Sequence, residues 1–222
     1  MNLSRKIERP RPINEIVLER LRDDIVNGVL QLGEKISEQQ LADAYEVTKA
    51  PIRAAYGRLQ SEGLVEIRPQ SGTYVFRPTH EALRSLCELR IALELEAARL
   101  SIQRAPLRLS QLVTENYAQM LVALSRDDSN TYHQLDTALH LIFFELADSP
   151  YLYETYRARV SSAFAALRNR FSQARPHNEF SIRQHQEIRD RVVAADLPGL
   201  QSILREHVEH TETYYEAFLA TG

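Results

Sequence analysis

Apolar residues recur every three or four positions through most of the chain, and this spacing predicts helices. The first predicted helix begins near Ile13 and ends before Gly28. Ser37, followed three residues later by Gln40, forms a capping-box pattern and predicts the start of a second, short helix. Thr48 predicts the start of a third helix, whose apolar positions continue until a glycine ends it at position 63.

The pattern changes to short β-rich runs after the third helix. Residues 64–67 and 73–76 are rich in β-branched and aromatic side chains, and a turn containing Pro69 and Gly72 separates them. This arrangement predicts a β-hairpin. Three helices followed by a hairpin are typical of a winged helix-turn-helix, which we predict for residues 13–77.

Helical spacing continues beyond Pro78, and no strand pattern returns there. The predicted helices are separated by prolines and by the pair Pro198-Gly199, and they span residues 79–104, 109–125, 129–148, 151–173, 179–195 and 197–219. Six helices with short connections fit an antiparallel bundle. We therefore predict a mainly α protein with a flexible tail over 1–12, the winged helix-turn-helix over 13–77, and an all-α antiparallel helical bundle over 78–222.

Composition narrows the class of protein further. Only 7 of 222 residues are glycine, below the usual share of about 7%, which favours a helical chain. The single cysteine, Cys87, excludes an intramolecular disulfide and favours a reducing compartment. Because we find neither a signal-peptide pattern nor an apolar run long enough for a membrane helix, we expect a cytoplasmic protein. The net charge of −3 divides into +1 over residues 1–77 and −4 over residues 78–222, which is compatible with a locally basic DNA-binding module.

Cationic and hydroxyl side chains gather at the start of the third predicted helix. In a helix-turn-helix this first turn enters the major groove, where side chains reach base edges and phosphates. Thr48, Lys49 and Arg53 occupy it, and an arginine can pair with guanine through two hydrogen bonds. Ser71 and Gly72 in the predicted wing could contact the DNA backbone. We therefore predict a double-stranded DNA operator as partner, with solvated charges on an ordinary helix as the alternative.

The third helix and the wing carry a family resemblance. The segment from Val47 to Val75 is similar to the DNA-reading part of the GntR family of bacterial transcription regulators. The positions that match the family pattern are Val47, Thr48, Pro51, Arg53, Leu59, Gly63, Leu64, Gly72, Thr73 and Val75. The resemblance implies DNA contacts from the residues named above, and from Gln39 where many members have a phosphate-binding arginine. Lys49 also replaces a family arginine, which keeps the charge but loses the planar fork.

A second resemblance follows directly after the wing. The pattern Glu-Leu-Arg-x-x-Leu-Glu spans Glu88–Glu94 and is similar to the opening of the all-helical effector domain, called FCD, of the FadR-like branch of that family. Six predicted helices place the chain nearer the VanR-like subgroup. The resemblance implies a homodimer that responds to a small organic acid, and family precedent favours a repressor released by this effector over an activator.

Four side chains on three predicted helices face the same interior. Asp136 and His140 lie one helical turn apart on the apolar side of their helix, and His185 and His207 lie on the inner faces of two later helices. Buried imidazole and carboxylate groups need partners. Their convergence indicates a metal site, with hydrogen-bonded core residues as the alternative.

The resemblance supports the metal interpretation. A metal-binding subset of the effector domains uses Asp-x-x-x-His on one helix and one histidine from each of two later helices, and the four residues match this set. Three nitrogens and one oxygen suit Zn²⁺ or Ni²⁺, and Mn²⁺ is also compatible.

Other polar residues are candidates for an effector pocket beside the predicted metal site. An ion with an open coordination position would bind a carboxylate effector, and Arg90 could pair with the same carboxylate; a salt bridge with Glu94 is the alternative. Arg168 is a weaker pocket candidate, for which we expect a solvated or core role. His80, at the linker, and His177, after a proline, are expected at the surface.

Together these patterns predict a ligand-responsive, DNA-binding transcription regulator and not an enzyme. Three alternatives stay open at this point: the ion itself is the signal, the ion is purely structural, or the bundle is a metalloenzyme. The last is weakened because the sequence offers no separate candidate for a general base beside the ligands.

Overall fold

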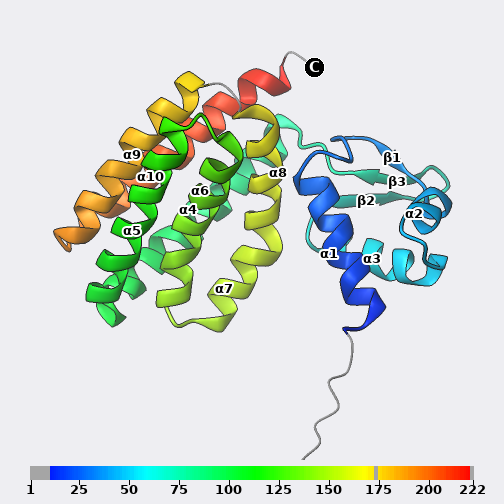
Figure 1. Cartoon of the computed structure of the whole chain (residues 1–222), viewed down its shortest axis with the longest axis horizontal. Helices are drawn as coiled ribbons and strands as arrows, with labels where there is room; N and C mark the ends of the chain where they lie inside the picture. Colours follow the sequence, from blue (N-terminus) through cyan, green and yellow to red (C-terminus); the bar gives the residue numbers. More distant parts are fainter. Residues whose placement is uncertain (1–10, 173–174, 221–222) are drawn as a thin grey trace, which may run out of the picture. The chain divides into compact units, whose positions relative to one another are not determined.

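The computed structural model describes residues 11–172 and 175–220, and the chain divides into two compact units, the first ending at Phe76 and the second beginning at Arg77 (Figure 1). The predicted tail over 1–12 lies almost entirely outside the described residues. Ten α-helices and three short strands make up the described parts, which confirms the prediction of a mainly α fold. The elements of the first unit are α1 (Ile13–Val26), β1 (Lys35–Ile36), α2 (Glu38–Ala44), α3 (Lys49–Ser61), β2 (Val65–Arg68) and β3 (Gly72–Val75).

The first unit is built on the contact between α1 and α3. Their apolar positions are fully buried: Leu21 and Ile25 of α1 and Ile52 and Leu59 of α3 are each 0% exposed. Burying a side chain of this size contributes about 1.5–3 kcal/mol. This contact fixes α3 with its opposite, polar side towards solvent.

The three strands form one antiparallel sheet in the order β1-β3-β2. The hairpin of β2 and β3 is in the predicted place, with Val65 opposite Val75 and Arg68 opposite Gly72. The sequence pattern did not indicate β1, because a strand of two residues shows no alternation to read.

Gly72 at the start of β3 adopts a backbone that other residues rarely take, with φ +128°. We expect Gly72→Ala to destabilise the protein by about 1–3 kcal/mol, because such a backbone costs an L-residue roughly that amount. Gly57→Ala is the matched control: Gly57 lies in α3 with open space around its Cβ position, so alanine there should stabilise by up to about 1 kcal/mol. Urea unfolding followed by circular dichroism measures both, and a shift in the same direction for the two variants would contradict the expectation.

The second unit is helical throughout its described residues. Its elements are α4 (His80–Arg104), α5 (Pro106–Ser125), α6 (Ser129–Leu146), α7 (Pro150–Tyr156), the π-helical turn η1 (Arg157–Ser161), α8 (Ser162–Phe171), α9 (Arg175–Val193) and α10 (Leu197–Leu219). α4 packs against α6 and α10, and α9 packs against α5 and α10, so that these helices enclose one core (Figure 1). None of the described helices is long and apolar enough to cross a membrane.

Two predicted boundaries were wrong for local reasons. We expected a helix to begin at 109 and another at 179, but α5 begins at Pro106 and α9 at Arg175. Proline is favoured in the first turn of a helix, because its missing amide has no partner there in any case. The helix predicted over 151–173 corresponds to a helical run over residues 150–171, in which η1 interrupts the α-helical hydrogen bonds between α7 and α8.

Candidate metal centre and nucleic-acid interface

The predicted DNA-reading residues lie where α2 meets α3 and on the wing. Lys49 and Arg53 are exposed on the first turns of α3, and Thr48 precedes that helix without a side-chain bond to its amides. Gln39 is exposed on α2 and donates to Asp43 at 2.7 Å. The wing places the Ser71 hydroxyl 2.8 Å from the hydroxyl of Tyr74. Gly72, which begins β3, is half-buried.

Glu38 holds Arg53 in place at this surface. Arg53 Nε donates to Glu38 Oε2 at 2.7 Å, although the arginine side chain is 66% exposed. The bond uses Nε and not the two terminal amino groups. An arginine can donate two hydrogen bonds to the O6 and N7 atoms of guanine. The ion pair therefore orients Arg53 rather than burying it.

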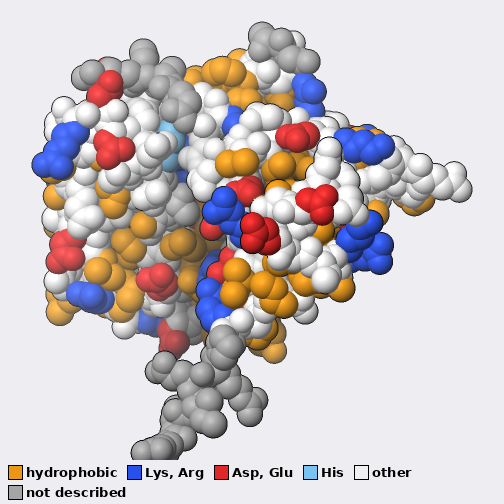
Figure 2. Space-filling view, turned by 45° about the vertical axis from the view of Figure 1, so that its right-hand side comes forward, with side chains coloured by type: hydrophobic (Ala, Val, Ile, Leu, Met, Phe, Trp, Pro, Cys, Tyr) orange, Lys and Arg blue, Asp and Glu red, His pale blue; other side chains and the backbone are white. Residues whose placement is uncertain are grey.

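Charge on the surface is mixed in sign. On the face drawn in Figure 2, Lys and Arg side chains are interspersed with Asp and Glu. A mixed surface gives little long-range attraction for DNA. The predicted DNA contacts thus depend on the positions of individual cationic side chains. Lys49 and Arg53, both exposed, are the clearest candidates.

The second unit brings the four predicted metal ligands together. Asp136 and His140 come from α6, His185 from α9 and His207 from α10. One ligand atom from each lies within 4.8 Å of those of the others, and no member is more than 4% exposed. This cluster could hold an ion.

The protonation of His140 follows from its two neighbours. Its Nδ1 donates to Glu94 Oε2 at 3.0 Å, and its Nε2 faces Arg90 Nη2, which can only donate, and therefore accepts. That accepting nitrogen lies 3.5 Å from Asp136 Oδ1. In this structure each of these two atoms contacts a guanidinium group, His140 Nε2 that of Arg90 at 2.8 Å and Asp136 Oδ1 that of Arg168 at 2.9 Å. Metal bonds of about 2.1 Å in a tetrahedral site separate neighbouring ligands by roughly 3.4 Å. The spacing therefore fits a divalent ion.

The other two imidazoles are also fixed from outside the cluster. His207 Nδ1 lies 3.0 Å from Gln184 Oε1 and donates to it. His185 Nδ1 lies 3.4 Å from the Tyr132 hydroxyl, while its Nε2 is buried and has no hydrogen-bond partner among the described residues. A buried polar atom without a partner is costly, and an ion would satisfy it.

Burial and charge set the ionisation states of the cluster. Burial lowers the pKa of His185 to about 4 and holds the pKa of His207 well below its usual range. Burial alone would raise the pKa of Asp136, but Arg168 and the neighbouring imidazoles outweigh it and hold that pKa well below its ordinary value. At neutral pH the cluster therefore offers a carboxylate and unprotonated imidazole nitrogens, the forms that bind metal.

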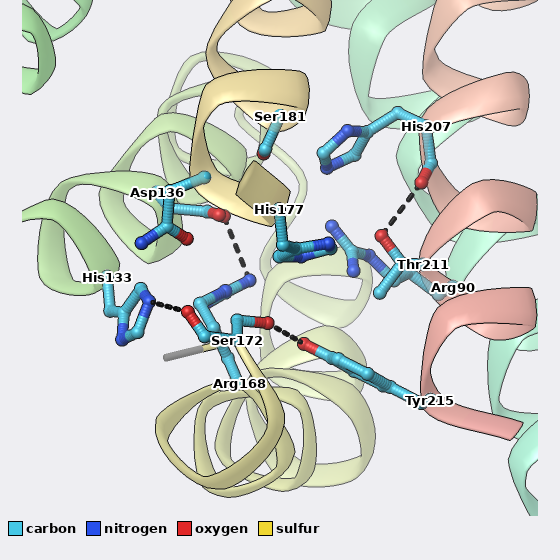
Figure 3. Close-up of a pocket in the computed structure, with 11 residues that line it drawn as sticks. Arg90, His133, Asp136, Arg168, Ser172, His177, Ser181, His207, Thr211 and Tyr215 are labelled. Atoms are coloured by element: carbon cyan, nitrogen blue, oxygen red, sulfur yellow. Dashed lines mark hydrogen bonds and ion pairs between the residues drawn. The ribbon is translucent and has the colours of Figure 1, made fainter. Parts of the chain in front are cut away.

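A small polar pocket adjoins the cluster, and Figure 3 shows the side chains that line it. Two arginines face it from different helices: Arg90 from α4 and Arg168 from α8, whose Nη2 lies 2.9 Å from Asp136 Oδ1. The other lining residues are His133, Asp136, Ser172, His177, Asn178, Ser181, His207, Thr211 and Tyr215. Its volume of about 10 Å³ is space for roughly one water molecule.

Two residues of this pocket can be compared with their expectations. Arg168, a weaker pocket candidate with an expected solvated or core role, is 6% exposed, pairs with the predicted ligand Asp136 and also lines the pocket. His177 was expected at the surface, but it is half-buried and lines the pocket. The cause is the early start of α9, which places His177 inside the helix and stacks its ring on Tyr214 at 3.8 Å. His80 is exposed, as expected.

Arg90 makes the salt bridge that was the alternative to its role in binding a ligand. Its Nε donates to Glu94 Oε1 at 2.7 Å, and both side chains are 1% exposed. The sequence spacing of four residues could indicate this pair. It could not indicate that Glu94 also accepts from His140 and, at 3.0 Å, from the Tyr156 hydroxyl, because those partners come from distant segments.

Comparison with known proteins gives the family. The model of bacterial regulatory proteins of the gntR family matches residues 13–75, and that of the FCD domain matches residues 85–210. The chain is 24% identical over 209 residues to the HTH-type transcriptional repressor RspR of Escherichia coli, covering 94% of this chain and 91% of the relative. It is 27% identical over 222 residues to the Glc operon transcriptional activator of the same species, covering 89% and 87%.

A solved structure shares the fold. The E. coli protein McbR/YncC superposes with a TM-score of 0.78 over 96% of this chain and 99% of that protein, at 18% identity. The relatives are transcription regulators and not enzymes, which confirms the prediction that this protein is no enzyme. The chain belongs to the GntR family of bacterial transcription regulators, in the branch whose second domain is an FCD domain.

Proposed function

We propose that the protein is a repressor released from its operator by a small carboxylate, which binds at a metal ion in the FCD domain. The observation that carries the proposal is the cluster of Asp136, His140, His185 and His207, four buried donors beside a pocket that two arginines also face. The GntR family consists of bacterial regulatory proteins, and this membership supports the DNA-binding role. The carboxylate is what we propose that the second domain senses.

The donor set supports a divalent ion. Three imidazole nitrogens and one carboxylate oxygen suit Zn²⁺ or Ni²⁺, and Mn²⁺ accepts the same ligands. An oxygen of the effector would need a coordination position beyond these four protein ligands, so the ion would have to expand its coordination when the acid binds. The bound ion would supply a positive charge for that oxygen.

The pocket supports an anionic effector. Arg90 has its Nη1 buried without a hydrogen-bond partner among the described residues, and Arg90 lines the pocket. Donors of this kind favour a carboxylate, which a guanidinium binds through two parallel hydrogen bonds. Ser181 and Thr211 add hydroxyl groups to the lining. Because the pocket has space for roughly one water molecule, an organic acid would enter only by moving the lining side chains apart.

The proposed direction is repression, and the proposed assembly is a homodimer. RspR is named a repressor, whereas the Glc operon relative is named an activator. Two reader helices of a dimer would enter successive major grooves of a near-palindromic site. An effector changes DNA affinity only if it binds one arrangement of the dimer more tightly than the other.

The experiment combines metal analysis with thermal unfolding. The purified chain is screened against small organic acids, with and without a chelator. We expect a bound divalent ion, and a carboxylate that raises the melting temperature only when the ion is present. Melting that no acid alters would contradict the carboxylate proposal. Stabilisation by metal alone would favour a metal sensor, and an ion whose removal changes melting but not DNA affinity would favour a structural role.

Arg53 provides a test of the reader surface. We expect Arg53→Ala to weaken operator binding by about 1–3 kcal/mol, because the variant removes a base-reading guanidinium. Arg58→Ala is the matched control, since it removes the same charge from the last turn of α3. Binding is measured by mobility shift on a duplex that the parent protein selects from a random pool. Equal affinity of the parent and Arg53→Ala would remove this residue from the interface.

A further inference from the structure

One hydrogen bond in the second unit joins an arginine to a proposed metal ligand. Arg90 Nη2 lies 2.8 Å from His140 Nε2. A guanidinium has donors only, and the other ring nitrogen of His140 donates to Glu94, so Nε2 accepts this bond with its lone pair. Both residues are 1% exposed, so water does not compete for the contact.

The same lone pair is the one that an ion in the cluster needs. The unprotonated nitrogen of an imidazole has a single in-plane lone pair, which serves one partner at a time. Asp136 differs, although it also pairs with a buried arginine: a carboxylate offers about four acceptor sites. Its contact with Arg168 at 2.9 Å therefore leaves sites for an ion, whereas the contact of Arg90 with His140 leaves none.

The surroundings of Arg90 show what its displacement would release. Its Nε is bound to Glu94, and its guanidinium carbon lies 4.4 Å from the centre of the Phe164 ring, so the side chain is anchored at one edge and one face. Nη1 has no hydrogen-bond partner among the described residues. Without the bond to His140, both terminal nitrogens would be donors without an internal partner, at the edge of the pocket shown in Figure 3.

We infer that Arg90 is a stand-in cation at the metal centre, which the ion displaces from His140 and thereby makes available to a carboxylate. This inference rests on the proposed function and adds a coupling to it. Metal binding raises the affinity for the effector through Arg90 as well as through direct coordination. By linkage, effector binding raises the affinity for the metal by the same factor. In the metal-free protein Arg90 satisfies the His140 nitrogen.

The test measures Zn²⁺ affinity of the full-length, metal-stripped chain by competition with a chromophoric chelator. Arg90→Met should bind Zn²⁺ about tenfold more tightly than the parent, because a bond from a charged donor no longer has to be broken. Arg168→Met is the matched control: it removes another buried cation beside the same cluster, but one whose ligand partner, the Asp136 carboxylate, keeps other acceptor sites open for an ion. It should bind Zn²⁺ no more tightly than the parent.

Each outcome separates the possibilities. Equal tightening in both variants would assign the effect to general charge repulsion and overturn the inference. Zn²⁺ binding by the parent with no tightening in Arg90→Met would also overturn it, while leaving the metal centre in place. A parent that binds no Zn²⁺, Ni²⁺ or Mn²⁺ would overturn the metal centre and the inference together. Should Arg90→Met fail to fold, crystal structures of the stripped and Zn²⁺-loaded parent decide: the contact between Arg90 and His140 should be present in the first and absent in the second.

Discussion

Replacing His185 by alanine should remove the metal ion from the protein. His185 offers a buried nitrogen with no other partner among the described residues, and it is the ligand that α9 contributes. Loss of an outer-shell partner of a metal ligand already costs about 10–100-fold in affinity, so loss of a ligand should cost more. Metal content after dialysis, measured by emission spectrometry, should fall from one ion per chain in the parent to a trace in His185→Ala.

His133→Ala is the matched control for that experiment. His133 is also a buried histidine, 3% exposed on the helix that carries Asp136, but its Nε2 donates to the backbone oxygen of Ser172 at 3.1 Å. Its loss should lower stability without removing the ion. Full occupancy in His185→Ala would show that this histidine is no ligand, and loss of metal from both variants would show that occupancy reports folding rather than ligation.

The sequence could predict much of the fold because the relevant signals are local. Helical spacing and start residues such as Ser37 give the helices, and the β-rich runs around Gly72 give the hairpin. The two-residue strand β1 carries no such signal, since only its pairing with β3 makes it a strand. The π-helical turn η1 was equally hidden, because it changes hydrogen bonding without changing the apolar spacing.

For the proposed site, too, the sequence could predict local relations but not contacts between distant segments. Asp136 and His140 share one helical face, so their spacing alone brings them together. Glu94 lies 46 residues from its partner His140, and Arg168 lies 31 residues from Thr137, to which it donates at 2.6 Å. Contacts between residues so far apart in sequence depend on how the helices pack against one another. The spacing of residues in a single sequence does not predict this packing. The pattern thus indicates ligand types but not the residues that orient them.

Replacing Glu94 by methionine should be among the most destabilising single changes in the second unit. The carboxylate accepts from three donors, Arg90, His140 and Tyr156, at 2.7 to 3.0 Å in a fully buried setting. Burial alone would raise the pKa of Glu94, but Arg90 and His140 outweigh it and lower this pKa to about 2, so the carboxylate is charged at neutral pH. Removing it leaves the buried Arg90 guanidinium without its anionic partner. Breaking a buried ion pair in this way lowers the free energy of unfolding by about 3–5 kcal/mol.

A double-mutant cycle tests whether the stranded charge is the cause. Methionine at both Glu94 and Arg90 fills similar volume without charge, and replacing both members of a buried pair is often close to neutral. We therefore expect the double variant to be more stable than Glu94→Met alone, although the lost bonds to His140 and Tyr156 prevent full recovery. Urea unfolding in the presence of chelator measures the four proteins without a contribution from metal. Additive losses, or a loss below about 1 kcal/mol in Glu94→Met, would mean that the pair is not the charge-balanced unit which its geometry indicates.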